Sequence, residues 1–383
     1  MANKHTNLQD LFTEIADAIR SKNNSSSPII ADDFPKEIEN LQSGFEYNNI
    51  DVTSIQEYAF ENCQELEHVN CYNLTSVGSG AFKGCSNLKT VVLYNSVTEV
   101  GAEAFEGCDN VTVYCEAATK PEGWSAEWDY SRGSRINVVW GFAPIETWDV
   151  SETEEDDVIA KLYPDVYNDD GYFLIINGYG KIFWETDIYI LFTEYRQGVN
   201  SAIISEGVTE IGDNAFYFCS SLQNVTIPDS VTSIGNNAFS GCSSLKEIVL
   251  PDSIISVGTS AFNRCYSLQK ITIPHFIGSI SDWMLQNCSS LKEIVIPDGV
   301  KYVWRGAFED CSSLQSVTIP DSVIKIDMEV FHNCTSLQSI IYLGTISQWQ
   351  SVTKHPAWDD NTPNCTIYCA DGKIAKDGTV TMY

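Results

Sequence analysis

The sequence predicts a repeat solenoid of short parallel β-strands, built as two stacked arrays that are joined by a small β insert and preceded by N-terminal helices. Three observations support this fold class: a motif that recurs about every 23 residues, a cysteine column with the same period, and an alternating apolar pattern inside each copy. Such a fixed period is typical of solenoids, in which no single unit can bury its own apolar face.

The repeating unit is visible in residues 234–256, which read IGNNAFSGCSSLKEIVLPDSIIS. Copies of this unit place a large apolar side chain at one position, in the column Phe216, Phe239, Phe262, Leu285, Phe308 and Phe331. Another position is always leucine, in the column Leu222, Leu245, Leu268, Leu291, Leu314 and Leu337. Because equivalent positions lie side by side when units stack, we expect both columns to fill the shared interior.

Nine of the thirteen cysteines follow the same period, which places them in one further column: Cys63, Cys85, Cys108, Cys219, Cys242, Cys265, Cys288, Cys311 and Cys334. A residue that recurs once per unit occupies one place in the stack, where a small apolar side chain fits the interior. We therefore interpret the nine as buried, reduced core thiols. Disulfides between neighbouring units are the alternative, which parallel side chains disfavour.

The end of each unit predicts a strand, because Leu-x-x-Ile-x-Ile-Pro alternates with a period of two and then stops at proline. Stacking sets these strands in a parallel sheet, and the Val-x-x-Ile-Gly segment turns the chain on the opposite side. Side chains beside the inward column then face outward. Ten of them are candidate ligand contacts: Asn224, Thr226, Glu247, Val249, Lys270, Thr272, Glu293, Val295, Ser316 and Thr318. Strand propensity alone also favours the β-branched members of this set.

These units resemble the BspA-like leucine-rich repeats, the treponemal type, over roughly residues 50–115 and 200–345. The resemblance is carried by the repeated motif seen in Ala261-Phe262, Cys265, Leu268, Ile271 and Ile273-Pro274. It implies adhesion and the recognition of a protein or a cell-surface glycan, without catalysis and without a cofactor.

The first 45 residues form a separate segment, with an apolar helical stripe made of Leu8, Leu11, Phe12, Ile15 and Ile19. A polar run, residues 21–27, ends this helix, and a second short helix begins near Asp32-Asp33-Phe34-Pro35. The segment is either a cap on the first array or a docking element. It resembles the N-terminal piece of phage tail-associated proteins from gut Firmicutes, which implies docking to tail or baseplate proteins through the apolar stripe.

The remaining chain divides into four parts, with residues 46–140 as the first array and its end cap, and residues 206–344 as the second array. Between them, residues 141–205 contain a hairpin, predicted from apolar runs at 158–163 and 172–176 that flank the turn 168–171. Residues 345–383 are a C-terminal cap. We expect each array to have its own start and end.

The net charge of −30 disfavours nucleic acid and anionic lipid as partners, because an acidic surface repels both. No run of 18 apolar residues is present, so no membrane insertion is expected, and the N-terminus lacks the pattern of a secretory signal peptide. The acidic runs 152–157 and 165–170 lack the ligand register of an EF-hand, so solvated loops are favoured over a calcium site.

No catalytic motif appears, so the sequence predicts neither an enzyme nor catalytic residues. Cys365 and Cys369 with nearby His355 lack a fourth zinc ligand, and core packing is the favoured role for both thiols, so no metal site is predicted. Two functions remain: a virion component of a phage that meets the host surface, or a BspA-like adhesin on the bacterial surface or in the extracellular space. A structural spacer is a third reading, and an oligomer is compatible with the sequence.

Overall fold

The computed structural model describes residues 45–47, 53–64, 66–70, 72–166, 171–183, 192–363 and 365–383. These residues belong to two compact units, Met1–Ala143 and Pro144–Tyr383, called unit 1 and unit 2 below. The predicted N-terminal helices, with the docking stripe Leu8, Leu11, Phe12, Ile15 and Ile19, lie outside the described residues, as do residues 168–170 of the predicted hairpin turn.

Unit 1 is a stack of turns whose strands form a main ladder and a short ladder. The main ladder is parallel in the order β1 (Phe45–Tyr47), β3 (Leu66–Asn70), β5 (Thr90–Leu93), β7 (Thr112–Cys115) and β10 (Asn137–Trp140). The short ladder is β2 (Ser54–Ile55), β4 (Ser76–Val77) and β6 (Glu99–Val100). The last turn carries the small antiparallel pair β8 (Tyr130–Ser131) and β9 (Ser134–Arg135), and tryptophan rings close this end: Trp124, Trp128 and Trp140.

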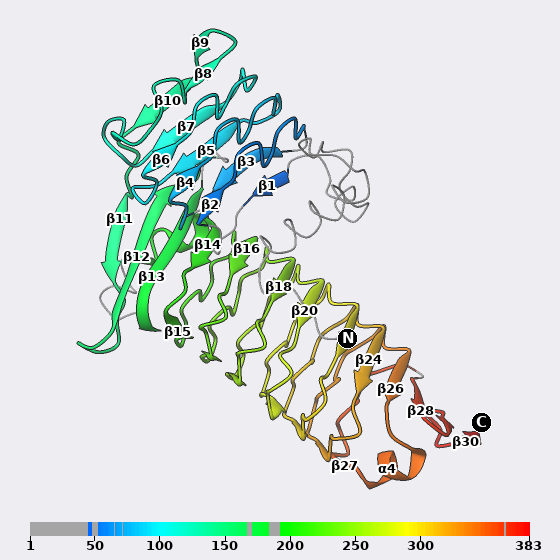
Figure 1. Cartoon of the computed structure of the whole chain (residues 1–383). Coiled ribbons are helices and arrows are strands. Elements are labelled where there is room, and N and C mark those ends of the chain that lie inside the picture. The colour runs from blue at the N-terminus through cyan, green and yellow to red at the C-terminus, as the bar shows by residue number, and fades with distance from the viewer. Residues whose placement is uncertain are drawn as a thin grey trace. The chain divides into compact units, whose positions relative to one another are not determined.

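Unit 2 begins with an antiparallel sheet of β11 (Glu146–Asp149), β12 (Asp157–Pro164) and β13 (Tyr172–Ile182). The pairing of β12 with β13 confirms the predicted hairpin. The first part of β13 then pairs in parallel with β14 (Val199–Ile204), and its last part pairs with β15 (Val208–Ile211). A short 3-10 helix, η2 (Arg196–Gly198), precedes β14. The strand β13 therefore starts both ladders of the second array (Figure 1).

The second array continues from these strands as a solenoid with two ladders (Figure 1). Its main ladder contains β16 (Asn224–Thr226), β18 (Glu247–Val249), β20 (Lys270–Thr272), β22 (Glu293–Val295), β24 (Ser316–Ile319), β26 (Ser339–Tyr342) and β28 (Thr366–Cys369). Its short ladder contains β17 (Ser233–Ile234), β19 (Ser256–Val257), β21 (Ser279–Ile280), β23 (Tyr302–Val303), β25 (Lys325–Ile326) and β27 (Thr353–Lys354). The Val-x-x-Ile-Gly segments, predicted only to turn the chain, thus pair in parallel as two-residue strands.

The C-terminal end of unit 2 is formed by one helix and two antiparallel strands: α4 (Ile346–Ser351), β29 (Gly372–Ile374) and β30 (Val380–Met382). The helix α4 begins at a capping box, in which the Thr345 side chain and the Gln348 side chain each bond the other residue's backbone N–H. Trp349 of this helix is buried against Tyr342 and Trp358, so aromatic side chains close this end of the stack.

The predicted columns lie in the interior of both units. The phenylalanine and leucine columns are fully buried, and neighbouring rings stack nearly parallel, as in Phe216–Phe239 and Phe239–Phe262. No disulfide joins any two of the twelve described cysteines. Each column thiol from Cys242 onward donates to the carbonyl of the buried apolar residue one turn earlier, as Cys242 does to Phe216 at 3.2 Å. Cys63 differs from the prediction, because it lies in the first described repeat of unit 1 and is only half-buried.

Candidate functional site

The main ladder of the second array presents an open outer face. In β18, Ile248 is 3% exposed and points inward, whereas Glu247 is exposed and Val249 is 68% exposed. β18 and β20 pair in parallel, which aligns Glu247 with Lys270 and Val249 with Thr272. The same pattern recurs in β22. The sequence-predicted ladders are therefore on the outer face, where strand alternation placed them.

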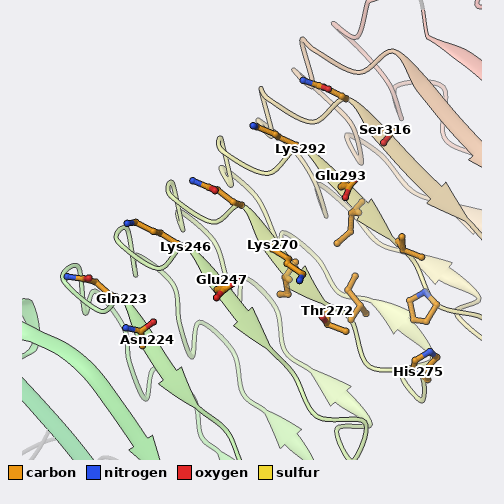
Figure 2. A pocket seen from close by; sticks show the side chains of 17 residues that line it. Gln223, Asn224, Lys246, Glu247, Lys270, Thr272, His275, Lys292, Glu293 and Ser316 are labelled. Atoms are coloured by element: carbon orange, nitrogen blue, oxygen red, sulfur yellow. The ribbon is translucent and has the colours of Figure 1, made fainter. Parts of the chain in front are cut away.

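This face is hollowed across five rungs, over a volume of about 1130 Å3 (Figure 2). We call this hollow the groove. Seven of the ten predicted contact residues line it: Asn224, Glu247, Lys270, Thr272, Glu293, Val295 and Ser316. The other three, Thr226, Val249 and Thr318, belong to the same strands and lie outside the lining.

The sequence interpretation missed one edge of the groove, which is a column of long polar side chains: Gln223, Lys246, Gln269, Lys292 and Gln315. Figure 2 shows Gln223, Lys246 and Lys292 along this edge. Each residue of the column lies one position before the first residue of its strand. The alternation of side chains along a strand therefore does not predict the direction of these side chains. The available signal was the repeated Gln or Lys at one position of every unit.

The opposite edge of the groove carries His275, where neighbouring units have aspartate. Its Nδ1 lies 2.8 Å from Oδ1 of Asp252, one turn earlier. This hydrogen bond holds the pKa of the Asp252 carboxyl below its usual value.

Three lysines line the groove of unit 2: Lys246, Lys270 and Lys292. Several cations elsewhere in this unit are paired, for example Lys181 with Glu210 at 3.0 Å and Lys325 with Asp327 at 2.8 Å. Among the described residues, the ammonium groups of Lys246, Lys270 and Lys292 make no hydrogen bond or ion pair. In a chain with a net charge of −30, the groove thus keeps three cations available to a ligand.

Two exposed apolar side chains belong to this face: Val295, which lines the groove and is 63% exposed, and Val249, which lies outside the lining and is 68% exposed. Both belong to a rigid, hydrogen-bonded strand whose neighbours are fixed by the stack. The combination of free cations, carboxylates and exposed methyl groups is suited to binding a ligand across a broad surface.

The described residues provide little support for catalysis or for metal binding. No group of three or more His, Cys, Asp or Glu side chains among them is arranged to hold a metal ion. In the acidic run 152–157, the Asp156 carboxylate accepts hydrogen bonds from the backbone and hydroxyl of Thr153, at 3.0 and 3.1 Å. Across the same described ranges, no helix is both long and apolar enough to cross a membrane.

The repeat sequence decides the family. The model of the BspA type leucine-rich repeat region matches residues 29–115 and 198–349, in six copies. The chain belongs to this family. BspA-type leucine-rich repeat proteins are cell-surface or secreted proteins, and leucine-rich repeat families are generally non-catalytic scaffolds.

Several solved structures of bacterial leucine-rich repeat proteins are similar to this BspA-type chain. A leucine rich cell surface protein from Faecalibacterium prausnitzii A2-165 is 23% identical, with 79% of this chain and 86% of that chain covered and a TM-score of 0.29. The T. pallidum leucine rich repeat protein is 27% identical, with coverages of 55% and 82% and a TM-score of 0.37. A leucine-rich repeat protein from Eubacterium ventriosum is 19% identical, with coverages of 83% and 88% and a TM-score of 0.42. No curated protein matches the sequence.

Proposed function

We propose that this protein is a non-enzymatic recognition scaffold that binds a protein or a cell-surface glycan through the groove of its second array. The observation that carries the proposal is the set of three lysines that line the groove and whose ammonium groups make no hydrogen bond or ion pair with the residues that the structure describes. Solenoids of this kind present a wide surface whose side chains are held in register by the sheet, so binding energy is spread over several rungs. Membership of a family of scaffolds agrees with this role.

The double variant Lys270→Glu with Thr272→Arg tests the groove. Both side chains are exposed on β20, so the fold should remain intact, while the charge pattern of the groove is reversed at its centre. We expect binding to host cells or purified cell-wall material to fall by about tenfold or more, measured by pull-down or biolayer interferometry.

The matched control is Ser256→Arg with Lys301→Glu, which makes the same net charge change away from the groove. Ser256 is an exposed residue of the short-ladder strand β19, and Lys301 is exposed one residue before β23. This control should bind like the wild type. Equal binding by both double variants would show that the groove is not the binding face.

The finer form of the proposal is a virion component of a phage that infects gut bacteria, in which the N-terminal segment docks to tail or baseplate proteins. Its support is the sequence resemblance of residues 1–45, with the apolar stripe Leu8, Leu11, Phe12, Ile15 and Ile19. The second candidate is a bacterial surface or secreted adhesin, which is supported by the family assignment. Mass spectrometry distinguishes the two locations: a virion component is detected in purified virions, and an adhesin is detected in fractions of bacterial surface or secreted proteins.

Removal of residues 1–43 tests the docking role of the N-terminal segment against a capping role. For an anchor, the truncated protein should keep its thermal transition within a few degrees and no longer assemble with tail structures. For a cap, the first array should become less stable or aggregate through its open end. Normal assembly together with a lowered melting temperature would contradict the anchor.

A further inference from the structure

The rungs of the groove alternate in sequence with a period of two. Lys246-Glu247-Ile248-Val249 and Lys292-Glu293-Ile294-Val295 are identical, and they are separated by Gln269-Lys270-Ile271-Thr272. The outer rungs continue the alternation, with Gln223 and Thr226 on one side and Gln315 and Thr318 on the other. The outer face therefore carries two copies of one surface patch: a lysine and a glutamate that line the groove, and an exposed valine, of which Val295 lines the groove and Val249 lies outside the lining.

The alternation is clearest on the groove face and covers only part of each unit. Elsewhere the two units that share this patch differ, with Asn237-Ala238-Phe239 in one and Trp283-Met284-Leu285 at the equivalent positions of the other. The phenylalanine column does not alternate, whereas the buried short-ladder position alternates between isoleucine and valine, in Ile234, Val257, Ile280, Val303 and Ile326.

The stack turns this sequence alternation into a spatial period. Neighbouring rungs of a sheet lie about 4.8 Å apart, so the two patches lie about 10 Å apart along the array. The pairings β18–β20 and β22–β24 keep the side chains of consecutive rungs in register. A ligand that satisfies both patches must present the same group twice at this spacing.

We propose that the groove binds a linear anionic glycan with a disaccharide repeat and one carboxylate in each disaccharide, lying along the main ladder. This inference rests on the proposed function and names its ligand class. One rung is close to the length of one pyranose unit in an extended chain, so every second sugar meets an equivalent patch. The chemistry of each patch matches one such sugar.

Each side chain of the patch has a distinct part in this recognition. Lys246 and Lys292 attract the carboxylates of alternate sugars, and their ammonium groups have no competing partner among the described residues. Glu247 and Glu293 accept hydrogen bonds from sugar hydroxyls, with Lys270 between them to offset their charge. The methyl groups of Val249 and Val295 pack against the apolar faces of the rings.

Three oligosaccharide probes of equal length test the period and the charge. Hyaluronate oligosaccharides carry a carboxylate on every second sugar, oligogalacturonates carry one on every sugar, and chitin oligosaccharides are neutral. We expect the full chain to bind hyaluronate oligosaccharides about tenfold more tightly than chitin oligosaccharides, measured by calorimetry near physiological ionic strength, where charges beyond about 8 Å are screened.

Two variants change the period of the lysines, and both introduce only residues that other rungs carry at the same position; a third variant is the control. Lys246→Gln with Lys292→Gln introduces the residue that neighbouring rungs carry in the same column, and it should lower hyaluronate binding about tenfold. Lys301→Gln, outside the groove, should leave that binding unchanged. Gln269→Lys adds a cation midway between the two lysines and should shift the preference toward oligogalacturonate.

Two results would overturn the inference: equal binding of hyaluronate and chitin oligosaccharides, or no glycan binding while protease treatment of cells abolishes binding of the chain. The second result would identify a protein partner and leave the proposed function standing. If Lys270→Glu with Thr272→Arg also left cell binding unchanged, the proposed function itself would fail.

Discussion

Phe239 lies between two parallel rings, with ring centroids 5.0 Å from Phe216 and 5.4 Å from Phe262. It is fully buried, and its backbone carbonyl accepts the thiol of Cys265 at 3.3 Å. One residue therefore joins three turns through ring stacking and a hydrogen bond. The stability of the array at the residue scale depends on such contacts between neighbouring units.

Phe239→Ala should destabilise unit 2, because it leaves a cavity between two rings that cannot collapse together. Large-to-small changes of this type cost about 3–5 kcal/mol. The control is Phe239→Leu, because Leu285 fills the same column naturally, and it should cost clearly less. Reversible urea denaturation measures both values. An alanine variant within 1 kcal/mol of the wild type would mean that the column does not carry the interior packing.

At the scale of the element, β13 is the strand that converts an antiparallel hairpin into a two-ladder solenoid. Its residues 172–176 pair with β14 and its residues 180–182 pair with β15, so the chain must bend between them. The bend is made at Gly178, which has a φ of +125° and where an added Cβ would lie 1.5 Å from the carbonyl oxygen of Asp157. Only glycine fits both the conformation and the close approach of β12.

Gly178→Ala should destabilise the start of unit 2 by at least about 1–3 kcal/mol, which is the cost of a strained backbone conformation. The control Gly299→Ala shares a positive φ of +94° but has no atom within 4 Å of the added Cβ. The control therefore isolates the conformational cost, and the difference between the variants measures the clash with Asp157. Equal losses in thermal unfolding would indicate that β12 moves away without cost.

At the scale of the whole molecule, the buried thiols make stability depend on alkaline pH. Burial raises the pKa of Cys265 and of Cys311 to about 12, well above the value of about 8.5 for a thiol in the unfolded chain. Below pH 8.5 the thiols are neutral in both states, and their contribution to stability is fully present. As pH rises from about 8.5 toward 12, thiols ionise in the unfolded state first, so the folded state loses stability.

The free energy of unfolding should therefore fall between pH 8 and pH 10, by about 1 kcal/mol per pH unit for each fully buried thiol once the unfolded thiol ionises. Denaturant titrations in the presence of a reductant measure the decrease. The variant Cys265→Ala removes one such thiol and should show a smaller decrease than the wild type, whatever its stability at pH 8. An identical pH dependence would contradict the burial argument.

The sequence predicted much of the fold because its signals are local and repeated. The period located the phenylalanine, leucine and cysteine columns, and strand alternation placed Glu247, Lys270 and Glu293 on the outer face. It missed Lys246 and Lys292 as groove residues, because they precede the strands and no alternation rule reaches them. It also missed the two-residue short ladder, which exists only when turns pair with one another.

The sequence by itself determined the repeat, the interior columns and which strand residues point outward, because each is fixed by a period within the chain. Only the tertiary structure decided which outward residues are open to a ligand. Val92 and Val249 occupy the same position of the repeat, yet Val92 is fully buried and Val249 is 68% exposed. No local pattern separates these two valines, because the exposure of a side chain depends on the tertiary packing around it and not on its position in the repeat.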